Sequence, residues 1–91
     1  MTVETKQDVM GALHWIHEAL MLTLDHGLAT PAAEYQAALD KARLRCASAG
    51  QFTKAARDQL QSAELPGLPF TRAQLLANAR FTLETALQVY T

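Results

Sequence analysis

The sequence has few of the residues that cross-link a chain or interrupt its helices. It contains one cysteine, three prolines and four glycines among 91 residues. A single cysteine, Cys46, cannot form an internal disulfide. No run approaches the roughly 18 apolar residues that a bilayer-spanning helix needs. The opening residues, MTVETKQD, lack the basic segment of a secretory signal. We therefore expect a protein of the cytoplasm, or of a host cell's cytoplasm, without membrane contacts.

An excess of charge of either sign is also missing. The formal net charge is −1. Residues 1–27 carry one basic and four acidic residues, 28–64 carry five basic and four acidic, and 65–91 carry two basic and one acidic. A site for a phosphate backbone needs surplus positive charge. The charge pattern therefore argues against nucleic-acid binding.

Helix-forming residues dominate what remains. The chain holds 17 alanines and 14 leucines, while valine and isoleucine are scarce. Hydrophobic residues make up 49% and charged residues 19%, a composition too apolar for a disordered chain. Ninety-one residues suffice for one domain with a small core. The composition predicts a single all-α domain over residues 1–91.

Helical spacing of apolar residues marks a first helix. Its seam has alternating spacings of four and three and comprises Val9, Leu13, Ile16 and Leu20. Thr5 is a suitable N-cap, with Asp8 three residues later. Gly27 is suited to end the helix. We therefore expect a helix from Thr5 to about Gly27.

A second apolar pattern follows Thr30 and Pro31, which suit the N-cap and the first helical position. Its members keep the same alternation without a break: Tyr35, Leu39, Ala42, Cys46, Ala49, Thr53, Ala56, Leu60 and Ala63. The pattern predicts one long helix over residues 31–64, about 50 Å in length at about 1.5 Å per residue. Gly50 disfavours a helix interior by roughly 1 kcal/mol. A break there, giving four helices in all, is the alternative.

The segment LPGLP, residues 65–69, is a strong helix breaker. Thr71 is then positioned to cap a last helix, with Gln74 at its third position and Phe70 able to pack on Leu75. The expected core face of this helix comprises Leu76, Ala79, Leu83, Ala86 and Tyr90, with Leu75 and Leu87 beside it. Short connections predict a small antiparallel three-helix bundle with a long central helix.

The first helix is more apolar than one buried face requires. Two flanks extend beyond its seam, one with Met10, His17, Met21 and Leu24, the other with Trp15 and Leu22. Both flanks could be buried against neighbouring helices. Alternatively, one flank stays outside the core and contacts another chain, as exposed tryptophan and methionine often do. Phe81, opposite the core face of the last helix, favours this second interpretation.

Groups of residues able to support catalysis or hold a metal are sparse. His14, His17 and Glu18 could share a helix face, but a stable site needs three or four ligands, and only His26 and Cys46 could add to them. The serines have no motif around them, and the glycines form no phosphate loop. We expect no enzyme, no metal and no cofactor.

The sequence thus predicts a non-catalytic protein that binds another protein, a second copy of itself, or both, as an adaptor, chaperone or inhibitor does. Secretion chaperones, phage-encoded inhibitors and antitoxin-like regulators include bundles of this kind, an analogy of fold alone. The candidate interface comprises Met10, Trp15, His17, Met21, Leu22 and Phe81.

Two alternatives of other classes remain. One is a DNA-binding regulator that uses the basic residues of segment 41–57: Lys41, Arg43, Arg45, Lys54 and Arg57. A helix-turn-helix over residues 52–79 would need a shorter turn than residues 65–69 provide. The other is a bundle that binds a ligand or metal.

Overall fold

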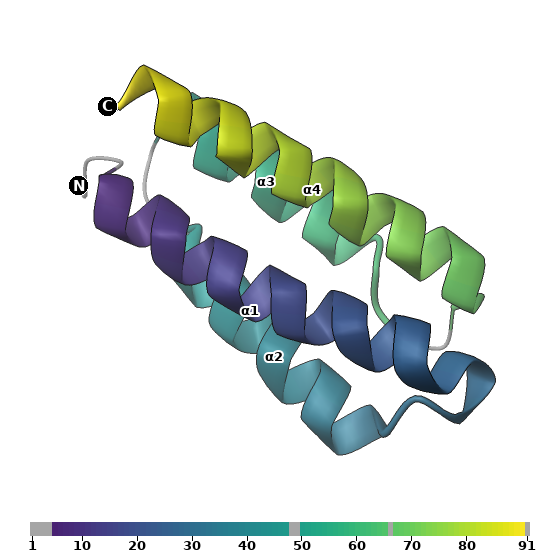
Figure 1. Ribbon diagram of the computed structural model, residues 1–91. Coiled ribbons are helices and arrows are strands. Elements are labelled where there is room, and N and C mark those ends of the chain that lie inside the picture. Colours follow the sequence, from purple (N-terminus) through teal and green to yellow (C-terminus); the bar gives the residue numbers. More distant parts are fainter. Residues whose placement is uncertain (1–4, 48–49, 66, 91) are drawn as a thin grey trace.

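The computed structural model describes residues 5–47, 50–65 and 67–90. Its helices are α1 (Lys6–His26), α2 (Ala32–Arg45), α3 (Gln51–Gln61) and α4 (Pro69–Val89), with a short 3₁₀ turn, η1 (Gly27–Ala29), after α1. Successive helices run antiparallel, and α1 begins at the end of the bundle where α4 ends (Figure 1). The all-α bundle predicted from the sequence is confirmed.

The prediction of one continuous helix over residues 31–64 is wrong, and the alternative of a break near Gly50 is confirmed. The helix α2 ends at Arg45, and Gly50 has extended backbone angles, φ −73° and ψ 153°, at the start of α3. A helix of about 50 Å would also exceed the longest dimension of the bundle, 37 Å. The chain instead folds back, so that α3 covers α4.

The repeat of apolar residues survives this break. Among the described members of the pattern, all are buried: Tyr35, Leu39, Ala42, Cys46, Thr53, Ala56, Leu60 and Ala63. Ala49, the remaining member, lies outside the described residues. The spacing of apolar residues indicates which side chains face the core. Two separate helices that pack on the same core can show the same spacing as one continuous helix.

The core fills the space between α1 and its neighbours α2 and α4, and between α4 and α3. The seam predicted for the first helix is confirmed at Val9, Ile16 and Leu20, which are buried, while Leu13 is partly buried and packs on the core. The predicted core face of α4 is buried at Leu76, Ala79, Leu83 and Ala86, with Leu75, Leu87 and Tyr90 packed at its edge.

The two ends of α1 form as predicted. The Thr5 hydroxyl accepts a hydrogen bond from the Asp8 backbone N–H at 3.2 Å, which makes Thr5 the N-cap. Gly27 has a φ of +55°, in the region that favours glycine, and its N–H donates to the carbonyl of Thr23. A β-carbon at Gly27 would meet no neighbour, so its backbone conformation alone calls for glycine.

The other two predicted caps are wrong. Neither α2 nor α4 has a side-chain cap. The Thr30 hydroxyl instead donates to the Gly27 carbonyl at 2.5 Å. The helix α4 begins at Pro69, two residues before Thr71, because proline's fixed φ suits the first helical position. Phe70 therefore lies in the first turn and is exposed rather than packed on Leu75.

A buried arginine joins the two connections at the far end of the bundle. Arg72 of α4 is 3% exposed. Its guanidinium donates to the carbonyl of Gly67 just before α4, and to the Gly27 carbonyl and the Thr30 hydroxyl of the α1–α2 connection, at 3.2 and 3.0 Å. Its central carbon lies 5.3 Å from the centre of the Tyr35 ring. One side chain of α4 thus fixes segments more than 40 residues away in sequence.

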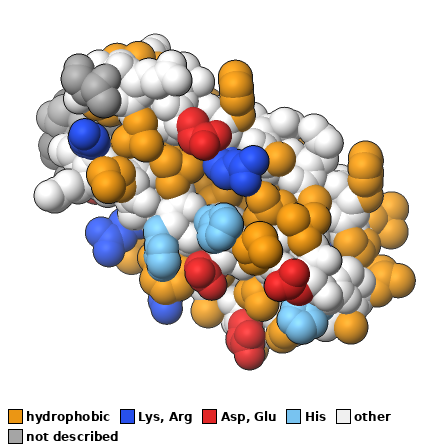
Figure 2. Space-filling view, in the orientation of Figure 1, with side chains coloured by type: hydrophobic (Ala, Val, Ile, Leu, Met, Phe, Trp, Pro, Cys, Tyr) orange, Lys and Arg blue, Asp and Glu red, His pale blue; other side chains and the backbone are white. Residues whose placement is uncertain are grey.

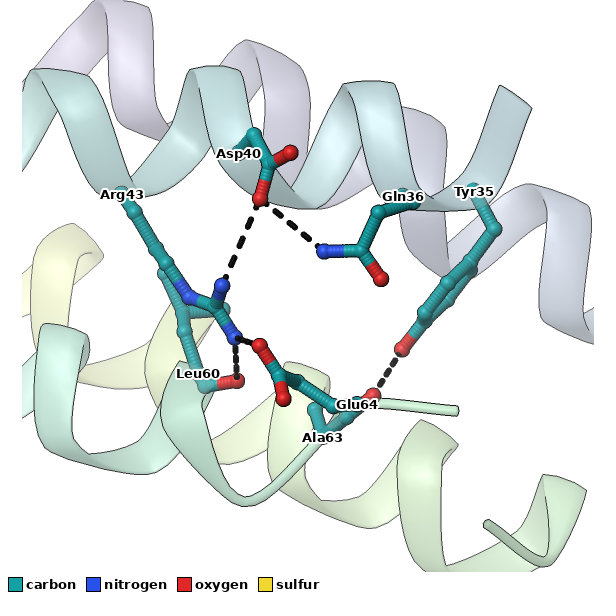
Figure 3. Close-up of polar contacts among 7 residues, drawn as sticks. All are labelled: Tyr35, Gln36, Asp40, Arg43, Leu60, Ala63 and Glu64. Atoms are coloured by element: carbon teal, nitrogen blue, oxygen red, sulfur yellow. Dashed lines mark hydrogen bonds and ion pairs between the residues drawn. The ribbon is translucent and has the colours of Figure 1, made fainter. Parts of the chain in front are cut away.

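Polar contacts connect α2 to the end of α3 (Figure 3). The buried Tyr35 donates its hydroxyl proton to the Ala63 carbonyl at 2.5 Å. Arg43 donates to the Leu60 carbonyl at 3.3 Å and pairs with Glu64 at 2.5 Å. These bonds use one carbonyl near the end of α3 and one just after it, and they hold this end beside α2.

We predict that Arg72→Ala lowers the free energy of unfolding by roughly 2–4 kcal/mol, because the Gly67 carbonyl and the Thr30 hydroxyl lose the Arg72 donor and a cavity forms above Tyr35. The neighbouring substitution Thr71→Ala is the matched control. It should change stability by less than about 0.5 kcal/mol, since Thr71 is exposed and caps nothing. Urea unfolding of both variants measures the difference. Equal losses would contradict the assigned role of Arg72.

The stability of the protein should also fall in strong alkali. Burial raises the pKa of Tyr35 above its ordinary value of 10.0, against the opposing effect of nearby Arg72 and Arg43. Above about pH 10 the unfolded chain loses the phenolic proton while the folded chain keeps it, so the free energy of unfolding decreases as pH rises.

Tyr35→Phe isolates this effect. At neutral pH it should destabilise the fold by roughly 1 kcal/mol, because Ala63 loses its donor. The difference from wild type should shrink as the pH rises above about 10. Tyr90→Phe is the control and should retain the alkaline decline. A difference between wild type and Tyr35→Phe that is constant over this pH range would show that the phenol keeps an ordinary pKa in the fold.

Candidate functional site

The two flanks of α1 have different environments. Trp15 and Leu22 are partly buried and pack on the core. The ammonium group of Lys41, on α2, lies 4.4 Å from the centre of the Trp15 ring, and the His14 ring meets Trp15 edge-on. This flank therefore packs against α2 and is largely used within the monomer.

The opposite flank of α1 faces solvent. The exposed fractions are 53% for Met10, 39% for Met21 and 61% for Leu24, and His17 between them is also exposed. Met10 and Met21 are 11 residues apart, which returns an α-helix to nearly the same direction after about three turns. They form a stripe of about 16 Å along the helix.

A matching stripe lies on α4. Phe70 is 80% exposed and Phe81 is 71% exposed. They are also 11 residues apart and so point to nearly the same side of their helix. Two stripes of equal spacing therefore run along two antiparallel helices of equal length, 21 residues each.

An apolar groove lies between the stripes. Its volume is about 360 Å³, and its lining comprises Leu20, Leu24, Phe70, Ala73, Gln74, Ala77 and Arg80. Ala73 and Ala77 are small, so Leu24 and Phe70 stand above them as walls. We call this groove, together with Met10, Met21 and Phe81, the α1–α4 face. Figure 2 shows hydrophobic side chains gathered over this side of the bundle.

Charged side chains lie in the groove and along the edge of the face. Arg80 lies 3.9 Å from Glu84, one turn along α4, and both side chains are about half exposed. On α1, the exposed Glu18 and Asp25 form an acidic outer edge. Such exposed charges contribute little affinity but can orient a partner.

The structure places the other candidate groups apart from this face or in structural contacts. Arg43 pairs with Asp40 and Glu64, and Lys41 covers Trp15. Arg45 lies along Gly11, where an added β-carbon would come within 3.1 Å of its side chain. Within residues 5–47, 50–65 and 67–90, no three His, Cys, Asp or Glu side chains gather in a metal-binding group. No helix in these ranges has the length and hydropathy to cross a membrane.

Of the six residues predicted at an interface, the structure brings Met10, Met21 and Phe81 to one face, with His17 at its rim. It separates Trp15 and Leu22, which pack on the other side of α1. Sequence reasoning missed Phe70 because the threonine after it resembled a cap. The 11-residue spacing from Phe70 to Phe81 was the available signal.

Comparison with known proteins gave no match: no family model fits the chain, and no curated protein or solved structure is significantly similar to it. The function therefore has to be argued from the α1–α4 face itself.

The two flanks can be told apart by substituting adjacent residues. Leu22→Gln should lower the free energy of unfolding by roughly 1–2 kcal/mol, because Leu22 packs on the core. Met21→Gln should change it by less than about 0.5 kcal/mol, because Met21 lies on the exposed flank of α1, outside the group of side chains that pack on the core, and both residue types favour helices. Thermal unfolding at a protein concentration low enough to exclude association provides the measurement. A larger loss for Met21→Gln would place that flank in the core.

Proposed function

We propose that this protein is a non-catalytic binding protein whose α1–α4 face contacts another protein surface. The observation that supports this is the exposure of five large apolar side chains on one side of a small bundle: Met10, Met21, Leu24, Phe70 and Phe81. Exposed apolar residues scattered singly carry no meaning, but these five line two adjacent helices.

The size of the face supports the proposal. With about 200 Å² for a fully exposed large side chain, the five together expose on the order of 600 Å². The largest apolar patch on a typical monomer is about 300–600 Å², so this one lies at the upper limit. A patch of that size is unfavourable in water and is typical of a surface that another protein covers.

Within this face, Phe70 and Phe81 are the expected anchors. Aromatic side chains carry a large share of binding energy when a partner desolvates them. Met10 and Met21 add flexible side chains that adapt to the shape of the partner. The role of Trp15 and Leu22 in this proposal is indirect: their packing fixes the rotation of α1 and so points the methionines outward.

The mode of action is that of an adaptor, chaperone or inhibitor, which needs complementary surfaces and no chemistry. The partner is another protein, a second copy, or both. A cytoplasmic setting is part of the proposal, since the one thiol, Cys46, is buried in the core and no disulfide is needed for stability. The contacts of Lys41 and Arg43 within the bundle favour this role over DNA binding.

Affinity capture with matched variants tests the proposal. The wild type, Phe81→Glu and Leu44→Glu are immobilised and exposed to extracts of the cells that produce the protein. Leu44 is the control because it is 73% exposed on α2, outside the α1–α4 face. Proteins retained by the wild type and by Leu44→Glu should be lost, by at least about tenfold, with Phe81→Glu. Retention that is equal for all three baits would contradict the proposal.

A further inference from the structure

We infer that the α1–α4 face binds a second copy of this chain, in a two-fold dimer in which α4 of each copy lies over α1 of the other. This inference rests on the proposed function, since it names the occupant of the same face. The width of the face, the spacing of its side chains and the distribution of its charges each support it.

The face is two helices wide. The groove is lined by Leu24 and Phe70, but Met10, Met21 and Phe81 lie outside it. A single helix docked in the groove would leave Phe81 on the outer side of α4 in water. A second copy presents two helices of the same length and covers both stripes. The exposed apolar area, on the order of 600 Å², approaches the 800 Å² or so per partner of a standard interface once the polar rim is added.

The side chains of the face also interdigitate in this arrangement. Leu20 and Leu24 share the groove with Ala73 and Ala77, and α1 and α4 run antiparallel. Moving one turn along α4, from Ala77 to Phe81, therefore corresponds to moving one turn back along α1, to about residue 16. That level lies midway between Met10 and Met21.

A two-fold axis parallel to the helices leaves the position of each residue along the helix direction unchanged. It therefore places Phe81 of one copy over the space between Met10 and Met21 of the other. The ring then fits between two thioether side chains, and sulfur–aromatic contacts are favourable. By the same register, Phe70 lies at the level of Leu28 in η1, which is 86% exposed. Each exposed aromatic thus meets an exposed aliphatic side chain.

The acidic edge of α1 favours this arrangement over the one that pairs α1 with α1. Glu18 and Asp25 form the outer edge of α1, and neither has an ion pair among the described residues. Pairing α1 with α1 would bring the two acidic edges together, which is unfavourable. Pairing α1 with α4 sets Glu18 at the level of Asn78 and Asp25 at the level of Thr71, exposed residues of α4 that carry no charge.

Sedimentation equilibrium tests the dimer. The wild type should sediment as a dimer, and Phe81→Glu should raise the dissociation constant by at least about 100-fold, because both copies lose an anchor and gain a charge at the contact. Leu44→Glu should leave the dimer unchanged. Circular dichroism should show the same helical content for all three. A Phe81→Glu variant that stays dimeric, or a wild type that stays monomeric, would overturn the inference.

Disulfide cross-linking tests the pairing of helices. His17 lies at the level of Phe81, so a mixture of the single variants His17→Cys and Phe81→Cys should form a mixed dimer under oxidation. The wild type, whose Cys46 is buried, is the control and should not cross-link. A predominance of dimers linked through two copies of Phe81→Cys would instead show α4 over α4 and overturn the arrangement.

The two proposals fail in different ways. A monomeric wild type overturns the dimer but leaves the proposed function in place if Phe81→Glu still loses captured proteins that Leu44→Glu retains. A monomeric wild type whose captured proteins do not depend on Phe81 contradicts both.

Discussion

The buried guanidinium of Arg72 is the contact on which the arrangement of this bundle depends. A buried charge is costly unless its donors find acceptors. Here backbone carbonyls and a hydroxyl accept hydrogen bonds from the two terminal nitrogens of Arg72, its Nε has no acceptor among the described residues, and the Tyr35 ring lies against the face of the guanidinium. The backbone approaches closely at Gly67, where an added β-carbon would lie 3.1 Å from the Glu64 carbonyl and 3.3 Å from Arg72. The hydrogen bonds of Arg72 fix where α4 begins. Phe70, two residues before Arg72, therefore lies at the side of the groove.

The sequence predicts the core of this protein better than its connections. Seam residues such as Val9, Leu39 and Leu83 were identified because burial follows from apolar character repeated at helical spacing, wherever the helices end. The sequence does not decide between a break and a continuous helix at Gly50, because the same apolar repeat continues through the break. The caps at Thr30 and Thr71 were predicted wrongly because a local signal, threonine before a helix, competed with a neighbouring proline and with a distant arginine.

Some residues of the candidate site can be recognised from the sequence, and others depend on distant contacts. Met10, Met21 and Phe81 were recognisable because they lie away from the core positions of their helices. Whether Trp15 belonged with them depended on the position of α2, and specifically on Lys41, 26 residues later in the chain. Contacts such as the bond from Tyr35 to the Ala63 carbonyl join residues 28 positions apart through a backbone group, which has no signature in a sequence.

The helix α1 therefore has two apolar flanks with separate tasks. Trp15 and Leu22 bind it to α2 and set its rotation about its own axis. That rotation leaves Met10 and Met21 on the exposed flank that also carries Leu24, which lines the groove with Phe70 of α4. A single apolar flank would have stabilised the bundle equally well within the monomer. Much of the second flank stays in water within the monomer, and the exposure of Phe70 and Phe81 on the neighbouring helix is the physical basis for the proposed partner surface.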